Sequence, residues 1–169
     1  MFNDKIFFLK RRNMTASVHL ATGAASALFV QNYLSVKYDW QYDVGRRYLL
    51  GFVAGLLSHI VFDAFPHAEY TQHGEALMAI LCLEGAVMMA VIPSWQGPVM
   101  AQLLTWGMIG AAVPDGLYYT GKYFSFELLE RVHSLLHVFH GKVLFIYSSH
   151  PIQAMIAIAA VIYVRIKSA

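Results

Sequence analysis

The sequence predicts an all-α protein, a polytopic membrane helical bundle of four to five spans with an additional interfacial helix that carries histidines. Two features of the composition predict this class: 58% of the 169 residues are hydrophobic and only 13% are charged. A water-soluble domain carries about 25% charged residues, so half that proportion is typical of membrane proteins. The third observation is that several apolar stretches approach the roughly 20 residues that a helix needs to cross a bilayer.

The predicted spans are separated by glycine, proline or charged residues, which are frequent where helices begin or end. They cover residues 14–35, 48–65, 76–92, 99–113 and 152–166. The fourth stretch is short for a span, which leaves a count of four or five. Because no internal repeat divides the chain, we expect one membrane-embedded helical domain over residues 1–169.

Two segments outside the spans have a mixed character. Residues 1–13 combine four Lys or Arg residues with several phenylalanines, which predicts a basic amphipathic anchor at the membrane surface. A cleaved signal peptide is the alternative interpretation of this segment. Residues 118–149 are more polar, and a helix over 124–139 is expected to lie at the interface. Basic residues are slightly more numerous on the side of the N-terminus, which favours a cytoplasmic N-terminus in a bacterial inner membrane.

The charge and the cysteine count exclude several classes of function. Twelve Lys and Arg against ten Asp and Glu leave a net charge of +2, which is too small to attract a nucleic acid. The single cysteine, Cys82, excludes a disulfide framework and a thiolate-rich metal site. We therefore expect no nucleic-acid partner, and the sequence leaves the oligomeric state open.

A first cluster of candidate metal ligands lies at the end of the second span. His59 and Asp63 are four residues apart, which places both on one face of a helix. Pro66 ends that helix, so we expect His67 to fold back over the same point. Ionisable groups inside a membrane cost at least about 2.5 kcal/mol each, so each needs a reason to be there. The spacing suits a metal ion; the alternative is a His–Asp hydrogen bond that locks two helices.

A second cluster consists of His133, His137 and His140. On a helix these side chains fall within an arc of about 60°, so one neighbour would meet all three. Leucine would pack better at such positions and leave no polar group unsatisfied. We therefore predict that His137 and His140 are metal ligands, with His133 as an additional candidate. The alternative is a wet interfacial face on which histidine is simply tolerated.

Three further residues complete the predicted site. His19 lies early in the first span and is a candidate metal ligand. Asp115 follows Pro114 at the end of the fourth span, where an Asp-Gly turn is the alternative interpretation. Glu84 lies near the middle of the third span, where a carboxylate needs a partner or a proton. We predict that Asp115 and Glu84 are catalytic and transfer protons; Asp115 is alternatively a further metal ligand or a residue that orients the ligands.

Alternating spans would bring most of these side chains to one membrane face, the face that also holds the N-terminus. This coincidence predicts one shared metal site. Imidazole and carboxylate ligands without thiolates suit Zn²⁺, with Mn²⁺ or Fe²⁺ as alternatives. The number of candidate ligands is enough for one or two ions, and two ions together can hold a phosphoryl group.

The motifs Ser58-His59-x-x-x-Asp63 and Pro114-Asp115, with the early His19 and the start of the second cluster at His133, resemble a known group. They are similar to the YdjM-like (LexA-binding) inner-membrane metal-dependent hydrolase family and, more distantly, to zinc-dependent phospholipase C. The resemblance implies a helical, membrane-bound hydrolase with a zinc-type centre that acts on phosphoester or lipid substrates. The motifs stand in a different order from the family's, and no His-Arg-Gly motif occurs. The residues that match the family's pattern best are His59 and Asp63, in the Ser-His-x-x-x-Asp motif.

We therefore expect a membrane-embedded metal-dependent hydrolase whose partners are the lipid bilayer and a lipid or lipid-linked small-molecule substrate. Two other classes remain open. A proton or metal transporter would need polar groups at successive depths, and Glu84 alone lies clearly at mid-depth. A non-catalytic scaffold would use its histidines only to stabilise contacts between helices.

Overall fold

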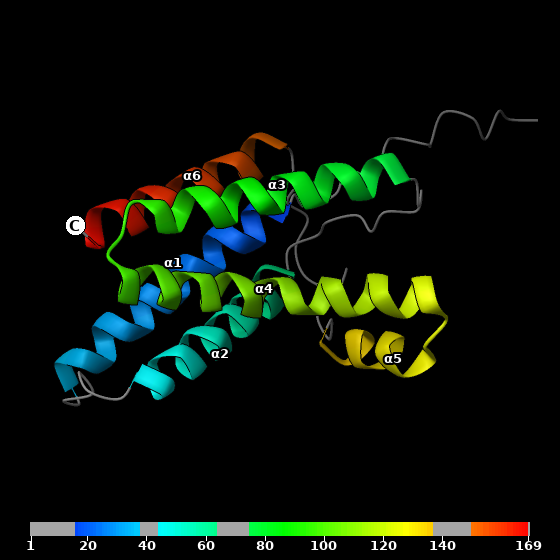
Figure 1. Ribbon diagram of the computed structural model, residues 1–169, viewed down its shortest axis with the longest axis horizontal. Coiled ribbons are helices and arrows are strands. Elements are labelled where there is room, and N and C mark those ends of the chain that lie inside the picture. Colours follow the sequence, from blue (N-terminus) through cyan, green and yellow to red (C-terminus); the bar gives the residue numbers. More distant parts are fainter. Residues whose placement is uncertain (1–15, 38–43, 64–74, 137–149, 169) are drawn as a thin grey trace, which may run out of the picture.

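The computed structural model describes residues 16–37, 44–63, 75–136 and 150–168, in which all regular secondary structure is α-helical (Figure 1). The helices are α1 (Ala16–Lys37), α2 (Val44–Asp63), α3 (Glu75–Ser94), α4 (Pro98–Phe124), α5 (Glu127–Leu136) and α6 (His150–Lys167). The predicted all-α class is therefore confirmed.

Helix α1 lies at the centre of the described structure, in contact with α2, α3, α4 and α6 (Figure 1). Helices α1, α2 and α4 also pack against one another, and α5 folds back along α4. In α1, Gly23 lies against Gly107 and Ala111 of α4, and the later residue Ala27 lies against Gly107. Against α2, His19 contacts His59 and Ala27 lies near the earlier residue Gly51. Helix α1 therefore runs antiparallel to both α2 and α4. The first part of α1, the end of α2 and the second half of α4 therefore meet at one end of this three-helix unit.

The three helices approach closely because each presents small residues to the other two. The small residues recur every four positions: Gly23 and Ala27 in α1, Gly51 and Gly55 in α2, Gly107 and Ala111 in α4. A Cβ atom at Gly55 would collide with the carbonyl oxygen of Gly107, and one at Gly23 would lie 2.6 Å from the same oxygen. Only glycine allows the backbones to come this close.

A second layer of contacts is made by larger apolar side chains. The largest fully buried ones come from α1, α3, α4 and α6: Val18, Leu28, Ile92, Leu104, Met108 and Val164. Burial of one such side chain stabilises a fold by about 1.5–3 kcal/mol relative to leaving it exposed. This cluster attaches α3 and α6 to α1 and α4, so that α1 is largely enclosed between Val18 and Leu28.

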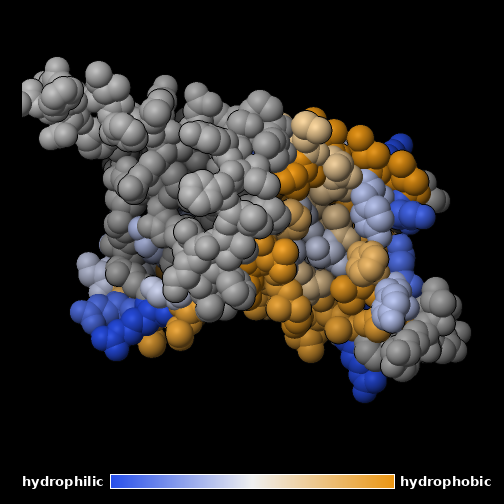
Figure 2. All heavy atoms as spheres, turned by 180° about the vertical axis from the view of Figure 1, so that it is seen from behind, coloured by the Kyte–Doolittle hydropathy of each residue, from blue (hydrophilic) through white to orange (hydrophobic). Residues whose placement is uncertain are grey.

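Large apolar side chains also line the outer faces of several helices. On α2 the exposed residues are Leu49, Val53, Leu57 and Val61, and on α3 they are Leu83, Val87 and Val91. On the face seen in Figure 2, apolar side chains cover much of the described part, and the most hydrophilic residues lie toward its two ends. Helix α2 therefore turns its small residues inward and its large apolar residues outward.

The predicted membrane spans are wrong. In the described part of the chain, no helix combines the length and the apolar character that crossing a bilayer requires. The prediction of an integral inner-membrane protein with four to five spans gave too little weight to polar residues inside the apolar stretches. Examples are Gln31 and Asn32 in α1 and Ser58 and His59 in α2.

Helix α4 also differs from its prediction, since it continues well beyond residue 113 and ends at Phe124. Pro114 has no N–H and therefore removes one backbone hydrogen bond within the helix. Its side chain is fully buried, and the contacts of α4 with neighbouring helices before and after this point keep the helix continuous. Asp115 consequently lies inside a helix and not in an Asp-Gly turn.

The end of α4 is a tight turn that leads directly into α5. Ser125 adopts the left-handed conformation, with φ of 56°, and its N–H donates to the carbonyl oxygen of Gly121. The N–H of Phe126 donates to the same oxygen at 2.8 Å, as in the common left-handed helix ends. The helix predicted over 124–139 is thus present from Glu127 to Leu136, and residues 137–139 lie outside the described ranges.

Candidate metal centre

His19, His59 and Asp115 come from three different helices and meet at one end of the α1–α2–α4 unit. His19 lies in the first turn of α1, His59 in the last turns of α2, and Asp115 in the second half of α4. Each offers one ring nitrogen or carboxylate oxygen, and these three atoms lie within 4.8 Å of one another. The three side chains are therefore close enough together to hold a metal ion.

The close helix packing explains why these side chains meet. Each candidate ligand continues a stripe of small residues by one helical turn: His19 before Gly23, His59 after Gly55, and Asp115 after Ala111. Because α1 is antiparallel to the other two helices, the three stripes end at the same point. The glycines that bring the backbones together thus also bring the ligand atoms together.

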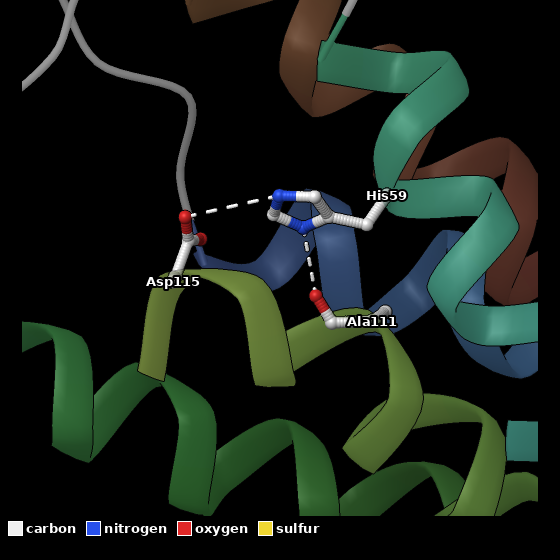
Figure 3. A network of polar contacts seen from close by, with 3 residues as sticks. All are labelled: His59, Ala111 and Asp115. Atoms are coloured by element: carbon white, nitrogen blue, oxygen red, sulfur yellow. Dashed lines mark hydrogen bonds and ion pairs between the residues drawn. The ribbon is translucent and has the colours of Figure 1, made fainter. Parts of the chain in front are cut away.

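His59 is held in one orientation by a backbone acceptor (Figure 3). Its Nδ1 lies 2.8 Å from the carbonyl oxygen of Ala111. A carbonyl oxygen only accepts hydrogen bonds, so Nδ1 carries the hydrogen and donates it. The other nitrogen, Nε2, then presents a lone pair toward Asp115, whose Oδ1 is 3.9 Å away. Metal-binding histidines are usually oriented in this way, with the second ring nitrogen donating to a carbonyl or carboxylate.

His19 stacks on His59, with ring centroids 4.2 Å apart and an angle of 25° between the planes. Both residues are buried, with exposed fractions of 4% and 0%. Burial disfavours the charged imidazolium, and two stacked imidazolium rings would also repel each other. The neighbouring Asp115 carboxylate acts in the opposite direction on His59, and the neutral imidazole is the form that binds metals.

Asp115 forms the open side of the cluster, since 42% of its side chain is exposed whereas that of His59 is fully buried. The 3.9 Å between His59 Nε2 and Asp115 Oδ1 is too long for a direct hydrogen bond. Two ligand atoms of one tetrahedral zinc ion lie about 3.4 Å apart. A small contraction would therefore bring this pair to the separation that a shared ion requires.

The three side chains fit a divalent metal by their chemistry as well as by their spacing. Two imidazole nitrogens and one carboxylate oxygen are a donor set that suits Zn²⁺, Mn²⁺ or Fe²⁺. The hydrogen bond from His59 to Ala111 supplies the outer support that such ligands normally have. The described residues thus supply three candidate ligands.

The structure brings some of the predicted site residues together and leaves others undescribed. His19 and His59 meet as candidate ligands, and Asp115, predicted to transfer protons, joins them. The side chains of Asp63, the last residue of α2, and of His133, in α5, lie outside the described part. So do the residues His67, His137 and His140. Their assignment as ligands stays a prediction.

The partner of Glu84 is a backbone group of another helix. Its Oε1 accepts a hydrogen bond from the backbone N–H of Ser17 at 3.2 Å. The contact joins α3 to the first turn of α1, across 67 positions in the sequence. Sequence reasoning correctly anticipated a partner for this carboxylate but could not identify it, because backbone groups carry no residue-specific signal.

Sequence reasoning also missed Ala111, which acts through its backbone carbonyl. An alanine has no polar side chain to attract notice. The available signal was the repeated four-residue spacing of small residues that leads to a polar residue, as in Gly107, Ala111 and Asp115. The same pattern in Gly51, Gly55 and His59 would have linked the two helices.

The described residues define an all-helical protein with a candidate His–His–Asp metal centre between three helices. No protein-family model, curated protein or solved structure matches the chain. The resemblance to metal-dependent hydrolases therefore stays a prediction from the motifs.

Proposed function

We propose that this protein is a metal-dependent hydrolase that binds a divalent ion, with Zn²⁺ as the leading candidate, at His19, His59 and Asp115. The observation that carries the proposal is the hydrogen bond from His59 Nδ1 to the carbonyl oxygen of Ala111. This bond leaves Nε2 with a lone pair directed at Asp115, with His19 stacked alongside. This orientation supports a metal site because it occurs beside two further donor groups, those of His19 and Asp115.

Among the described residues three side chains are candidate ligands, which is the number that catalytic centres use. Structural zinc sites are closed by four protein ligands, whereas catalytic sites use three and leave a position for water or substrate. Zn²⁺ in such a site lowers the pKa of a bound water to about 7 and so supplies a nucleophile at neutral pH. The partial exposure of Asp115 leaves one side of the cluster accessible to a small molecule.

The charge of the donor set favours an anionic substrate. Two neutral imidazoles and one carboxylate carry a charge of −1, so a divalent ion held by them leaves a net +1. A phosphoester has the opposite charge, and the sequence motifs independently resemble hydrolases of phosphoester or lipid-linked substrates. If Asp115 binds the ion through one oxygen, its second oxygen is available to accept a proton on the exposed side.

A non-catalytic scaffold is the competing function, and one observation favours it. The hydrogen bond from His59 to Ala111 also ties α2 to α4, which alone would stabilise the packing of these helices. A scaffold of this kind requires no metal, so metal content separates the two functions.

The test is elemental analysis of the purified protein after incubation with Zn²⁺, Mn²⁺ or Fe²⁺ and removal of the excess. We expect a stoichiometric ion in the wild type and its loss in His59→Ala. Ser58→Ala is the matched control, because Ser58 is an adjacent buried residue whose hydroxyl donates to the carbonyl oxygen of Gly55 within the same helix. Circular dichroism checks that each variant is folded.

Activity is then measured on a chromogenic phosphodiester with the metal-loaded protein. Asp115→Asn keeps the size of the side chain but removes its charge, and we expect hydrolysis to fall at least about tenfold. A wild type that retains no metal would contradict the proposal at its first step. A wild type that holds metal but hydrolyses no phosphoester would contradict the proposed substrate class.

A further inference from the structure

We propose that Glu84 is a positioning residue, which holds the first turn of α1 and thereby keeps His19 at the metal centre. The inference rests on the proposed function, because it concerns the geometry of one of the three candidate ligands. It assigns Glu84 a role other than the proton transfer expected from the sequence.

The contact that carries the inference is the hydrogen bond from the N–H of Ser17 to Oε1 of Glu84, at 3.2 Å. Ser17 is the second residue of α1. The first four N–H groups of a helix have no acceptor within the helix, so a partner from elsewhere is needed to satisfy them. A carboxylate is a favourable partner at this position, since the N-terminal end of a helix carries a partial positive charge.

Glu84 is well placed to control His19 because the two contacts fall in the same turn of α1. His19 follows Ser17 by two residues. The neighbour of Glu84, Gly85, also faces α1, since a Cβ added at Gly85 would lie 3.7 Å from Cδ1 of Leu20. Helix α3 thus faces the first turn of α1 on both sides of His19 and holds it through the hydrogen bond to Ser17.

Loss of this hydrogen bond would change the position of His19 and so weaken metal binding. The candidate ligand His19 lies in the first turn of α1, and its side chain is buried against His59. A first turn that can fray would allow the ring to leave the position in which it meets the other two ligands. Outer partners of metal ligands typically contribute about 10- to 100-fold to metal affinity.

Three substitutions separate positioning from proton transfer. Glu84→Gln keeps the length of the side chain and an oxygen that accepts the hydrogen bond, but it cannot carry a proton. Glu84→Asp keeps the carboxylate but shortens the side chain by one methylene, so it no longer reaches Ser17. Glu84→Ala removes both properties.

The readouts are Zn²⁺ affinity, measured by competition with a chelating dye, and the visible absorption spectrum of the Co²⁺-substituted protein, which reports ligand geometry. We expect Glu84→Gln to keep the affinity within about threefold and to keep the spectrum. Glu84→Asp and Glu84→Ala should lose about tenfold or more in affinity and change the spectrum. Thr105→Ala is the control for a general loss of stability, since its hydroxyl only bonds back to the carbonyl of Ala101 within α4.

The outcomes distinguish this inference from the proposed function. A wild type that binds no metal overturns the proposed function and this inference with it. A wild type that binds metal, together with a Glu84→Ala variant of unchanged affinity and spectrum, overturns this inference alone. If Glu84→Ala does not fold, the Gln and Asp variants decide: a Gln variant that loses affinity while the Asp variant keeps it also overturns the positioning role.

Discussion

The Nδ1 of His59 donates a hydrogen bond to the carbonyl oxygen of Ala111 across 2.8 Å, from the end of α2 to α4. The bond satisfies a polar group that is completely buried, which would otherwise cost about 1–3 kcal/mol. It also determines which nitrogen of the ring carries the hydrogen. This one contact therefore joins α2 to α4 and orients His59 as a candidate metal ligand.

The close approach of α1, α2 and α4 can be tested at Gly107. In Gly107→Ala the new methyl group would lie 2.6 Å from both Cβ of Ala27 and the carbonyl oxygen of Gly23. We expect the free energy of unfolding to fall by about 1–3 kcal/mol or more, as for other overpacked cores. The measurement is chemical denaturation followed by circular dichroism.

Gly116 is the matched control on the same helix, because a Cβ there would meet nothing within 4 Å. Alanine is the better helix former, so Gly116→Ala should increase the free energy of unfolding by up to about 1 kcal/mol. Equal effects of the two substitutions would show that the helices are further apart than described.

Metal binding should stabilise the fold. An ion that binds only the folded state adds about 2.7 kcal/mol to the free energy of unfolding at a concentration of 100 times its Kd. We therefore expect the Tm of the wild type to rise when Zn²⁺ is added and to fall again with a chelator. His59→Ala should show neither change, whereas Ser58→Ala should behave as the wild type. A Zn²⁺-dependent shift of the same size in His59→Ala would place the ion elsewhere.

Metal affinity should also depend on pH. Protons and metal ions compete for the same imidazole nitrogens. Affinity is therefore expected to weaken as the pH falls from about 8 to 5. Titrations with Co²⁺ at a series of pH values measure this dependence. A constant affinity across this range would argue against imidazole ligands.

The turn between α4 and α5 offers a prediction that is independent of metal. Ser125 has a positive φ of 56°, which costs a residue with a Cβ about 1–2 kcal/mol. Ser125→Gly should remove much of this cost and raise the free energy of unfolding by about 1 kcal/mol. Thr120→Gly, at an exposed position inside α4, should lower it instead. Denaturation curves that rank the two variants in the opposite order would contradict the left-handed assignment.

Much of the fold could be predicted from local patterns. Long apolar stretches ended by glycine or proline locate α1, α2, α3 and α6 to within four residues at each end. The prediction for α4 was wrong beyond residue 113 because Pro114 is an unfavourable residue within a helix. Packing on both sides of the proline outweighs that local preference, and no local pattern reveals such packing.

The candidate site, like the fold, could be predicted only as far as local patterns reach. His19 and His59 drew attention as polar residues within apolar stretches, and both are buried at the site. The local spacing suggested Asp63 as the partner of His59, and this stays a prediction; among the described side chains, the carboxylate beside Nε2 of His59 is Asp115, from another helix. Spacing along one helix identifies residues on the same face, but it does not show which face of a second helix lies opposite.

The amino-acid sequence by itself determined that the chain is helical and that histidines and carboxylates interrupt its apolar stretches, because both properties belong to single segments. Only the tertiary structure decided that three of these side chains, from α1, α2 and α4, share one point in space. The physical reason is the contact between helix backbones at Gly23, Gly55 and Gly107. That contact depends on residues far apart in the chain, which have no common pattern until the helices pack.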